Sequence, residues 1–421
     1  MTRTVRERLC LGHRRILRAA AAGVSALLLS SVALAQQSPY YIGAGLTLGH
    51  DTNVRRAPKG STSEEPDKFW NVFALLGLDQ PIGRHRLFAD ATIRRYEFED
   101  LTDLNHTAYA ANAGIDWSAA DKVSGTLRFG SQRSRSTATI GTTVVGGKAN
   151  LETAQDLQAR VQYGGTGLLT LEGELFHRSV DFTSALFDSL ENRYDAVRAG
   201  LLYRAGGALT LGIGARVTDG TYPKVVVLGG ALGSDDFKRR DVELSARWTP
   251  TGASVVSARL SSASQENKAV TSRDFDGVTG SVGWDWQPSG RTRLNTRLSR
   301  DTGLETTFQS LGSASTTSLG DASRLTTVLQ VGATWEATGK IQVDAMARYA
   351  DRSLVNTAPG GVTIDEDERA TTLSLGATYK PTRATQVACQ VSHEKRSTSG
   401  VQLTFPYSAR VLFCSGQIVL R

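Results

Sequence analysis

Apolar and polar residues alternate along most of this chain with a period of two. In the run that ends at Trp286, for example, Val282 and Trp284 share the parity of Trp286, whereas Ser281 and Asp285 lie between them. A period of two is that of a β-strand whose two faces meet different surroundings. The pattern therefore predicts strands with one apolar face and one polar face.

Alternating runs of this kind continue almost to the C-terminus, separated by residues that favour turns. We predict eighteen strands, at residues 40–52, 67–80, 86–98, 105–118, 122–135, 151–163, 167–180, 192–204, 208–219, 237–249, 253–265, 275–287, 291–302, 323–336, 340–353, 367–379, 384–396 and 406–420.

A short turn motif recurs at the end of every second run from the fourth to the sixteenth. It reads Trp-Thr-Pro-Thr-Gly from Trp248 and Trp-Gln-Pro-Ser-Gly from Trp286, and its copies are spaced by 38 to 49 residues. Such turns join the strands of tight β-hairpins. The aromatic residues that open the motif are expected to form one girdle at a membrane interface: Trp117, Tyr163, Tyr203, Trp248, Trp286, Trp335 and Tyr379.

The links between the predicted strands alternate in length. Short links follow even-numbered strands, whereas most links after odd-numbered strands are longer, as at 53–66, 136–150, 220–236 and 303–322. This alternation is typical of bacterial outer-membrane barrels, which place short turns on the periplasmic rim. We therefore expect an all-β, transmembrane antiparallel β-barrel of about 18 strands. Sixteen strands remain an alternative if the first or the last run pairs differently, and a secreted β-sandwich or β-solenoid is the soluble alternative.

The first 35 residues have the form of a signal peptide. Six arginines lie in the leader, residues 19–33 are apolar and small, and Ala33-Leu34-Ala35 has the small-x-small form of a cleavage site. Residues 1–35 are therefore predicted to direct Sec export to the outer membrane of a Gram-negative cell, and residues 36–421 to form the barrel. The alternative is a membrane anchor, for which the apolar stretch is short.

Removal of this leader changes the charge of the protein. The 48 basic and 41 acidic residues of the full chain become 42 and 40, because six arginines and one glutamate leave. The basic character of the full chain therefore does not indicate nucleic-acid binding. The hydrophobic fraction of 40% is low for a helical membrane protein but suits strands that turn one face to water.

If the apolar faces point outward, many charged residues face the lumen. An arginine-rich lumen would attract anionic or hydroxylated solutes; alternatively, the arginines pair with neighbouring carboxylates and brace the wall. The predicted lumen-facing residues are Arg128, Arg160, Arg178, Arg216, Arg247, Arg297, Arg348, Glu172, Glu174, Glu243, Asp285 and Asp344.

The chain carries no recognisable catalytic or metal-binding motif. The histidines after the leader show no metal-ligand spacing, and G-x-S-x-G, Cys-x-x-Cys and P-loop motifs are absent. His106 and Asp103 fall in one predicted outer loop, where a membrane-embedded hydrolase would place such a pair. We expect no enzyme activity, no cofactor and no metal, and we keep the hydrolase as an alternative to be tested.

Two cysteines, Cys389 and Cys414, remain after the leader is removed. If the last hairpin turns near residue 401, they lie directly opposite each other on adjacent strands. Directly opposed side chains are slightly farther apart than an average disulfide requires. A disulfide and a pair of small reduced side chains are both compatible with this spacing.

One segment of the sequence resembles a known family. It resembles the EpsL-type outer-membrane proteins of exopolysaccharide operons that accompany exosortase B, within the class of β-barrel porins, at Asp51-Thr52-Asn53-Val54, Gly83-Arg84-His85-Arg86, Arg95-Tyr96, Leu104, Tyr109 and Trp117. The resemblance covers about residues 40–136. It implies a pore that takes part in export of an extracellular polysaccharide.

This resemblance also sets the expected partners of the protein. We expect outer-membrane lipid, a polysaccharide, the barrel-assembly machinery and periplasmic polysaccharide-export components, and no nucleic acid. The alternative function is a structural or surface-interaction barrel with a closed lumen that anchors the polymer or an assembly partner.

Overall fold

The computed structural model describes residues 38–119, 122–136, 147–165, 167–226, 232–302, 324–357, 363–400 and 404–421. Residues Pro39–Arg421 form one compact unit, which is described below. The predicted signal peptide, residues 1–35, and the predicted long loop at 303–322 lie outside the described residues.

The described residues form eighteen strands and three short 3-10 helices. The first nine strands are β1 (Tyr40–Asp51), β2 (Asp67–Ile82), β3 (His85–Phe98), β4 (His106–Ala119), β5 (Val123–Arg135), β6 (Leu151–Tyr163), β7 (Leu169–Phe182), β8 (Asn192–Ala205) and β9 (Leu209–Val226). The second nine are β10 (Leu232–Thr251), β11 (Ser254–Asn267), β12 (Phe275–Ser289), β13 (Thr292–Asp301), β14 (Arg324–Glu336), β15 (Ile341–Thr357), β16 (Thr363–Tyr379), β17 (Thr385–Thr398) and β18 (Tyr407–Leu420). The 3-10 helices are η1 (Thr102–Leu104), η2 (Ala185–Leu190) and η3 (Thr271–Arg273). In this part of the chain no helix has both the length and the apolar character that crossing a membrane requires.

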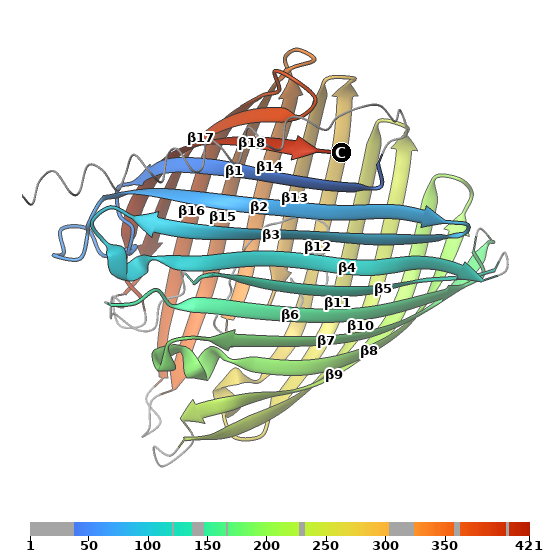
Figure 1. Ribbon diagram of the computed structural model, residues 1–421. Helices are drawn as coiled ribbons and strands as arrows, with labels where there is room; N and C mark the ends of the chain where they lie inside the picture. The colour runs from blue at the N-terminus through green and yellow to red at the C-terminus, as the bar shows by residue number, and fades with distance from the viewer. Residues whose placement is uncertain are drawn as a thin grey trace, which may run out of the picture. The chain divides into compact units, whose positions relative to one another are not determined.

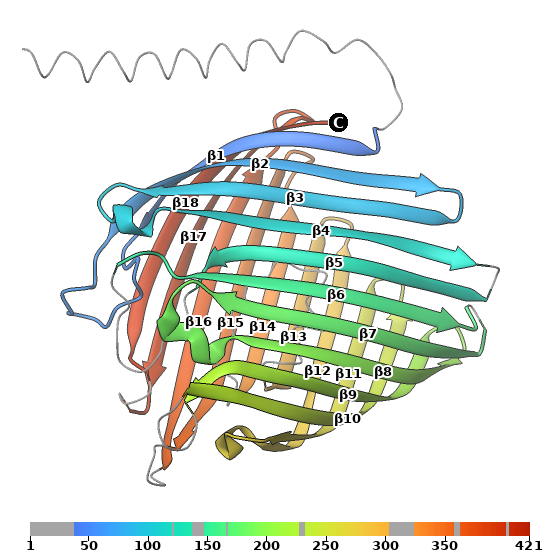
Figure 2. The same cartoon turned by 60° about the horizontal axis from the view of Figure 1, so that its bottom comes forward.

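The strands form a single closed antiparallel barrel (Figures 1 and 2). Each strand pairs with the next one along the chain, and β1 also pairs with β18, in a continuous register from Ile42 opposite Leu420 to Asp51 opposite Val411. Because the first and the last strand both belong to this closed sheet, the prediction of eighteen strands is confirmed and the alternative of sixteen is wrong.

The largest error in the predicted strands concerns the link at 220–236, which we expected to be a long loop. β9 continues to Val226 and β10 begins at Leu232, so only residues 227–231 connect them. Inward-facing Tyr222 and Phe237 pack with Phe176 and Tyr194 in one apolar cluster, and this packing extends the hairpin. Pro223 and the glycines nearby resemble a turn locally, and the sequence pattern therefore ended the two strands too early.

The outer surface of the barrel is apolar. On β1 the outward side chains Tyr40, Ile42, Leu46 and Leu48 are all exposed, Ile42 by 62%. The span 40–48 that contains them extends about 30 Å along the strand, which after strand tilt matches the apolar band of about 25 Å of an outer-membrane barrel. A soluble protein would bury such side chains, so the outer surface of the barrel is suited to a lipid membrane.

The seven aromatic residues of the predicted girdle all lie at the ends of even-numbered strands, next to the links that were expected to be short. Six of them are exposed on the outward face, Trp335 by 53%. The seventh, Trp117, packs its indole on Gly125 of the neighbouring strand. The girdle and the two ends of the barrel unit, at Pro39 and Arg421, therefore belong to the same rim.

Candidate functional site: the inner wall of the barrel

The structure places the twelve predicted lumen-facing residues on the face opposite to the apolar one. On β10, for example, Val242, Leu244 and Trp248 are exposed outward, and Glu243 and Arg247 have the opposite parity. Cross-strand register carries the same assignment from strand to strand, because directly paired residues share a face. Whether these residues contact a solute is a separate question, and their own contacts divide the wall into two regions.

In the first region, on β6 to β11, arginines and glutamates form a continuous ladder of ion pairs. Its centre is Glu243, which is only 2% exposed. Its carboxylate accepts hydrogen bonds or ion pairs from Arg198 at 2.8 Å, Arg216 at 2.7 Å and Arg259 at 3.1 Å. Three arginines around one buried carboxylate neutralise it and hold the four neighbouring strands β8 to β11 in register.

Glu172 forms the second node of this ladder. It pairs with Arg160 of β6 and, at 3.2 Å, with Arg198 of β8, and it accepts a hydrogen bond from Gln162. Arg198 therefore binds both glutamates and connects the two nodes. The predicted Arg178 is paired in a similar way, with Asp156 at 2.8 Å. In this region the arginines brace the wall.

Arg198 was missing from the predicted set, and its position depends on two glycines. Glu172, Gly200, Gly214 and Glu243 follow one another in a single cross-strand register row. The two glutamates are thus three strand spacings apart, or roughly 14 Å. The Arg198 guanidinium lies over the two glycines, 3.1 Å from the point where a Cβ of residue 214 would stand. Arg198 is five residues from outward-facing Tyr203, and the sequence could therefore have placed it on the inner face. Its partners depend on the cross-strand register, which the sequence does not show.

A side chain at position 214 should therefore displace Arg198. We expect Gly214→Val to destabilise the barrel by about 1–3 kcal/mol, the usual cost of overpacking, despite the good strand propensity of valine. The measurement is the urea midpoint of the detergent-folded protein. Gly173→Val is the matched control, because the corresponding position on β7 points outward and has no atom within 4 Å. Equal midpoints for the two variants would contradict the proposed seat of Arg198.

In the second region, on β10 to β15, the predicted arginines have no such partners. Arg247, Arg297 and Arg348 make no ion pair or side-chain hydrogen bond with any other residue that the structure describes. They lie on one register row, which runs from Arg247 across β11 and β12 to Arg297 and then through Gln330 to Arg348. Arg247 and Arg297 are exposed, on the inner face. We call these three residues the arginine row.

The remaining predicted residues make contacts that are not ion pairs. Arg128 lies over the ring of Phe88 at 6.0 Å. Asp344 accepts hydrogen bonds from Thr334 and Gln342, and Glu174 accepts one from Gln158. Asp285 has no ion pair or hydrogen bond with the described residues. Paired and unpaired side chains thus occur even on one strand, as with Glu243 and Arg247 of β10, and the sequence pattern did not indicate which residues are paired.

The loop between β1 and β2 lies over the inner wall at the rim of the long links. Val54, 1% exposed, packs with Leu104 of η1 and with Phe98, whose parity is inward. Arg56 in the same loop binds Asp51 at 2.7 Å and Glu394 at 3.1 Å. Burial lowers the pKa of Arg56, but Asp51 and Glu394 outweigh it, and the pKa lies above its usual value. This loop covers part of the opening.

The first residues of this loop organise a turn. The Asn53 backbone N–H donates to the Asp51 carboxylate at 2.9 Å, and the Asn53 side chain exchanges two hydrogen bonds of 2.8 Å with the Ala57 backbone. A bound cation would need free side-chain oxygens as ligands, and here both Asp51 oxygens and the Asn53 side-chain oxygen are engaged within the protein. The motif therefore shapes the loop.

The two residues considered for a hydrolase have separate partners. Asp103 pairs with Arg55 at 2.7 Å. His106 donates from Nδ1 to the Leu104 carbonyl at 2.7 Å and stacks on Tyr96. Both side chains thus take part in packing of the loops. Among the described residues no group of three or more histidine, cysteine, aspartate and glutamate side chains is arranged to hold a metal ion.

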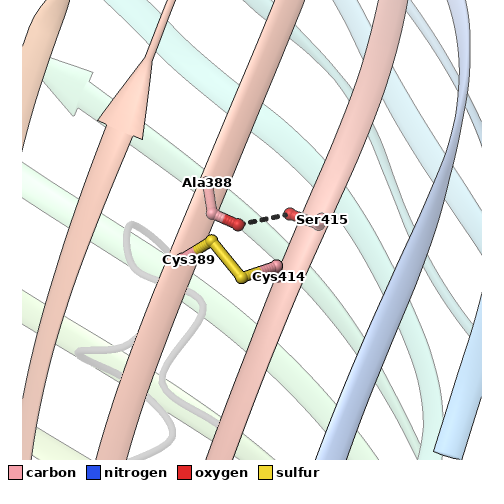
Figure 3. The surroundings of a disulfide bond; sticks show 4 residues. All are labelled: Ala388, Cys389, Cys414 and Ser415. Carbon is pink, nitrogen blue, oxygen red and sulfur yellow. Dashed lines mark hydrogen bonds between the residues drawn. A yellow bond between two sulfur atoms is a disulfide. The ribbon is translucent and has the colours of Figure 1, made fainter.

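Cys389 and Cys414 are direct register partners on β17 and β18, and their sulfur atoms are bonded (Figure 3). The Ser415 hydroxyl donates to the Ala388 carbonyl beside them at 3.5 Å. Both cysteines share the outward parity of Val387, Val391, Leu412 and Ile418. The disulfide therefore belongs to the apolar outer surface and not to the lumen.

We expect a mature chain beginning after Ala35 to show no titratable thiol when denatured without reductant, and two after reduction. The bond closes a loop with a sequence separation of 25 residues, for which a contribution of about 2–4 kcal/mol to stability is typical. The double variant Cys389→Ala and Cys414→Ala should lose this contribution, as measured by the urea midpoint under non-reducing conditions. Two thiols before reduction would contradict the bond.

Comparison with solved structures returns outer-membrane proteins of Pseudomonas aeruginosa. The crystal structure of the outer membrane protein OpdK matches with 13% identity and a TM-score of 0.48, over 90% of this chain and 99% of that chain. OccK9 (OpdG) matches with 13% identity and a TM-score of 0.47, over 91% and 100%, and OccK2 (OpdF) with 14% and 0.47, over 91% and 100%. No protein-family model and no curated protein sequence matches the chain. The assignment of the fold rests on the strand pairing of this chain itself.

Proposed function

We propose that this protein is an outer-membrane pore and that its arginine row contacts anionic solute in the lumen. The observation that supports this proposal most is the absence of ion-pair partners for Arg247, Arg297 and Arg348 among the described residues. Arg348 is half-buried, and a half-buried guanidinium without a carboxylate costs free energy. Arg247 and Arg297 are exposed to the lumen, so all three charges are more easily explained by a ligand than by bracing.

The paired region of the same wall sharpens this argument. There Arg160, Arg178 and Arg216 are all bound to carboxylates. One carboxylate lies near the row as well, that of Asp285, two residues from Gly283 of the same register row, yet the row forms no ion pair with it. An eighteen-stranded barrel is wide enough to hold an aqueous lumen, in which the row would present positive charge to passing solutes.

For the solute we propose an extracellular polysaccharide with acidic groups that is exported through the barrel. The support for this finer statement is the resemblance of residues 40–136 to EpsL-type proteins, together with the charge of the row. Because the chain has no nucleotide-binding motif, partner proteins in the periplasm would have to set the direction of transport.

Planar-bilayer recording tests the pore. Purified protein should give discrete steps of steady conductance, and an acidic polysaccharide added on one side should block them at lower concentration than a neutral polysaccharide of equal length. If both polymers block the conductance equally, the protein is a pore but the proposed preference for an acidic solute is wrong.

A structural barrel with a closed lumen is the second candidate. The specific observation in its favour is the loop packing at one rim, where Val54 lies over inner-wall residues on one side and Val270 packs against the cluster of Tyr222 and Phe237 on the other. Complete electrical silence of a folded, heat-modifiable protein would favour this candidate over the pore.

A further inference from the structure

The outward apolar face ends in a basic residue on four adjacent strands, at the rim of the long links. Toward this rim, the outward position next to Leu48 on β1 is His50. The one next to Trp70 on β2 is Lys68, and the one next to Leu412 on β18 is Arg410. On β17, Val391 is followed at the next two outward positions by His393 and Lys395. We call Lys68, His50, Arg410, His393 and Lys395 the seam patch, because they flank the junction of the first and last strands.

The residues of the seam patch are neighbours across the sheet. His50 is the register partner of Lys68, and His393 is the register partner of Arg410. The β1 and β18 sides are joined at this level by a hydrogen bond from the Thr52 backbone N–H to the Arg410 carbonyl, 3.0 Å long. Five basic side chains therefore lie side by side on one outward surface of four strands.

Most of these side chains have no anionic partner. Lys68 pairs with Glu99 at 3.0 Å. Lys395 and Arg410 are exposed and make no ion pair with the described residues, and the Nδ1 atom of His393 is buried there without a hydrogen bond. The patch thus carries positive charge that the protein itself does not neutralise.

The other side of the barrel is different at the same level. There the apolar face of β8, β9 and β12 ends in an aspartate, at Asp195, Asp219 and Asp276. Two basic residues at this level are paired, Lys238 with Asp219 at 3.4 Å and Arg193 with Asp181 at 3.5 Å. Arg240 on β10 and Arg300 on β13 also end the apolar face, but the neighbouring strands β9 and β12 end in an aspartate. A run of adjacent strands that all end in a basic residue is therefore a property of the seam.

We propose that the seam patch binds the phosphate groups of a phosphorylated glycolipid in the outer leaflet of the membrane. The apolar band below the patch, residues 40–48 on β1 and 412–420 on β18, has the length of the hydrocarbon layer. The patch therefore lies at the level of the headgroups, on the side of the long links. Lysine and arginine bind phosphate strongly there, because the site is partly desolvated. The proposal needs only insertion in this orientation and does not depend on the pore function.

The test measures how bisphosphorylated lipid A changes the stability of the full barrel in a neutral detergent. Loss of the fast-migrating folded form on heating is followed as a function of lipid concentration. For the unchanged protein we expect the lipid to raise the transition temperature, as a ligand that binds only the folded state must. The double variant Lys395→Gln and Arg410→Gln should need at least about tenfold more lipid for the same shift. The matched control is Lys238→Gln with Arg193→Gln, which should respond as the unchanged protein does.

Two further probes separate lipid from other anions. Dephosphorylated lipid A and inorganic pyrophosphate should each leave the transition unchanged, and an equal shift with either probe would overturn the proposal. Native mass spectrometry gives a readout that does not depend on unfolding, because the seam variant should retain fewer lipid A molecules than the control variant. Equal retention and equal lipid response of the two variants would also overturn it.

Discussion

Glu243→Gln should destabilise the barrel more than any other single charge neutralisation on the inner wall, by about 3–5 kcal/mol, the usual cost of breaking a buried ion pair. Glu243 is the shared partner of Arg198, Arg216 and Arg259. Glutamine has nearly the same shape, but it leaves three guanidinium groups without a countercharge in a site that excludes most water. The three guanidinium groups would then repel one another.

Urea unfolding in detergent, followed by the fluorescence of the six tryptophans, measures this effect. Glu266→Gln is the control, because Glu266 lies at an exposed outward position of neighbouring β11. Adding Arg259→Leu to Glu243→Gln should recover part of the loss, since one fewer unpaired cation stays in the wall. A loss below about 1 kcal/mol for Glu243→Gln would show that the ladder contributes little to the barrel.

Reversing the charge of the arginine row should change the ion selectivity of the pore without a comparable loss of stability. We expect the triple variant Arg247→Glu, Arg297→Glu and Arg348→Glu to shift the permeability ratio toward cations by roughly tenfold or more, because charges that line a narrow aqueous path set the local concentration of counterions. Since these arginines have no carboxylate partners among the described residues, no ion pair is broken.

The reversal potential under a salt gradient measures this shift, and lowering the ionic strength should enlarge it. Arg240→Glu with Arg300→Glu is the matched control: it reverses charge on β10 and β13 at outward positions. An unchanged reversal potential in the triple variant would mean that ions do not pass the row. A control that shifts as far as the triple variant would assign selectivity to the surface charge of the rim.

The strand pattern was readable from the sequence because each strand separates two media. Val282, Trp284 and Trp286 need an apolar surrounding and the residues between them do not, so the period of two persists without help from distant residues. The pattern misled most at the link between β9 and β10, where inward packing extends both strands. Tyr222 and Phe237 extend a hairpin through residues that resemble a turn, because both rings pack inward on Phe176 and Tyr194.

The contacts of the inner wall could not be predicted in the same way. Arg216 and Arg247 have the same residue type and the same inward parity, yet Arg216 binds Glu243 at 2.7 Å and Arg247 has no described partner. The difference depends on cross-strand register. A shift by two residues would keep every side chain on its face and still exchange all of the partners.

The sequence by itself determined the face that each side chain takes, the alternation of short and long links and a strand number of eighteen or sixteen, because these follow from local periodicity and local turn chemistry. Only the tertiary structure decided which arginines are neutralised, that Gly200 and Gly214 make room for Arg198, and that Lys395 and Arg410 stand together at the seam. The physical reason is that pairing across a closed sheet joins residues far apart in the chain, and no local pattern records which residue lies opposite which.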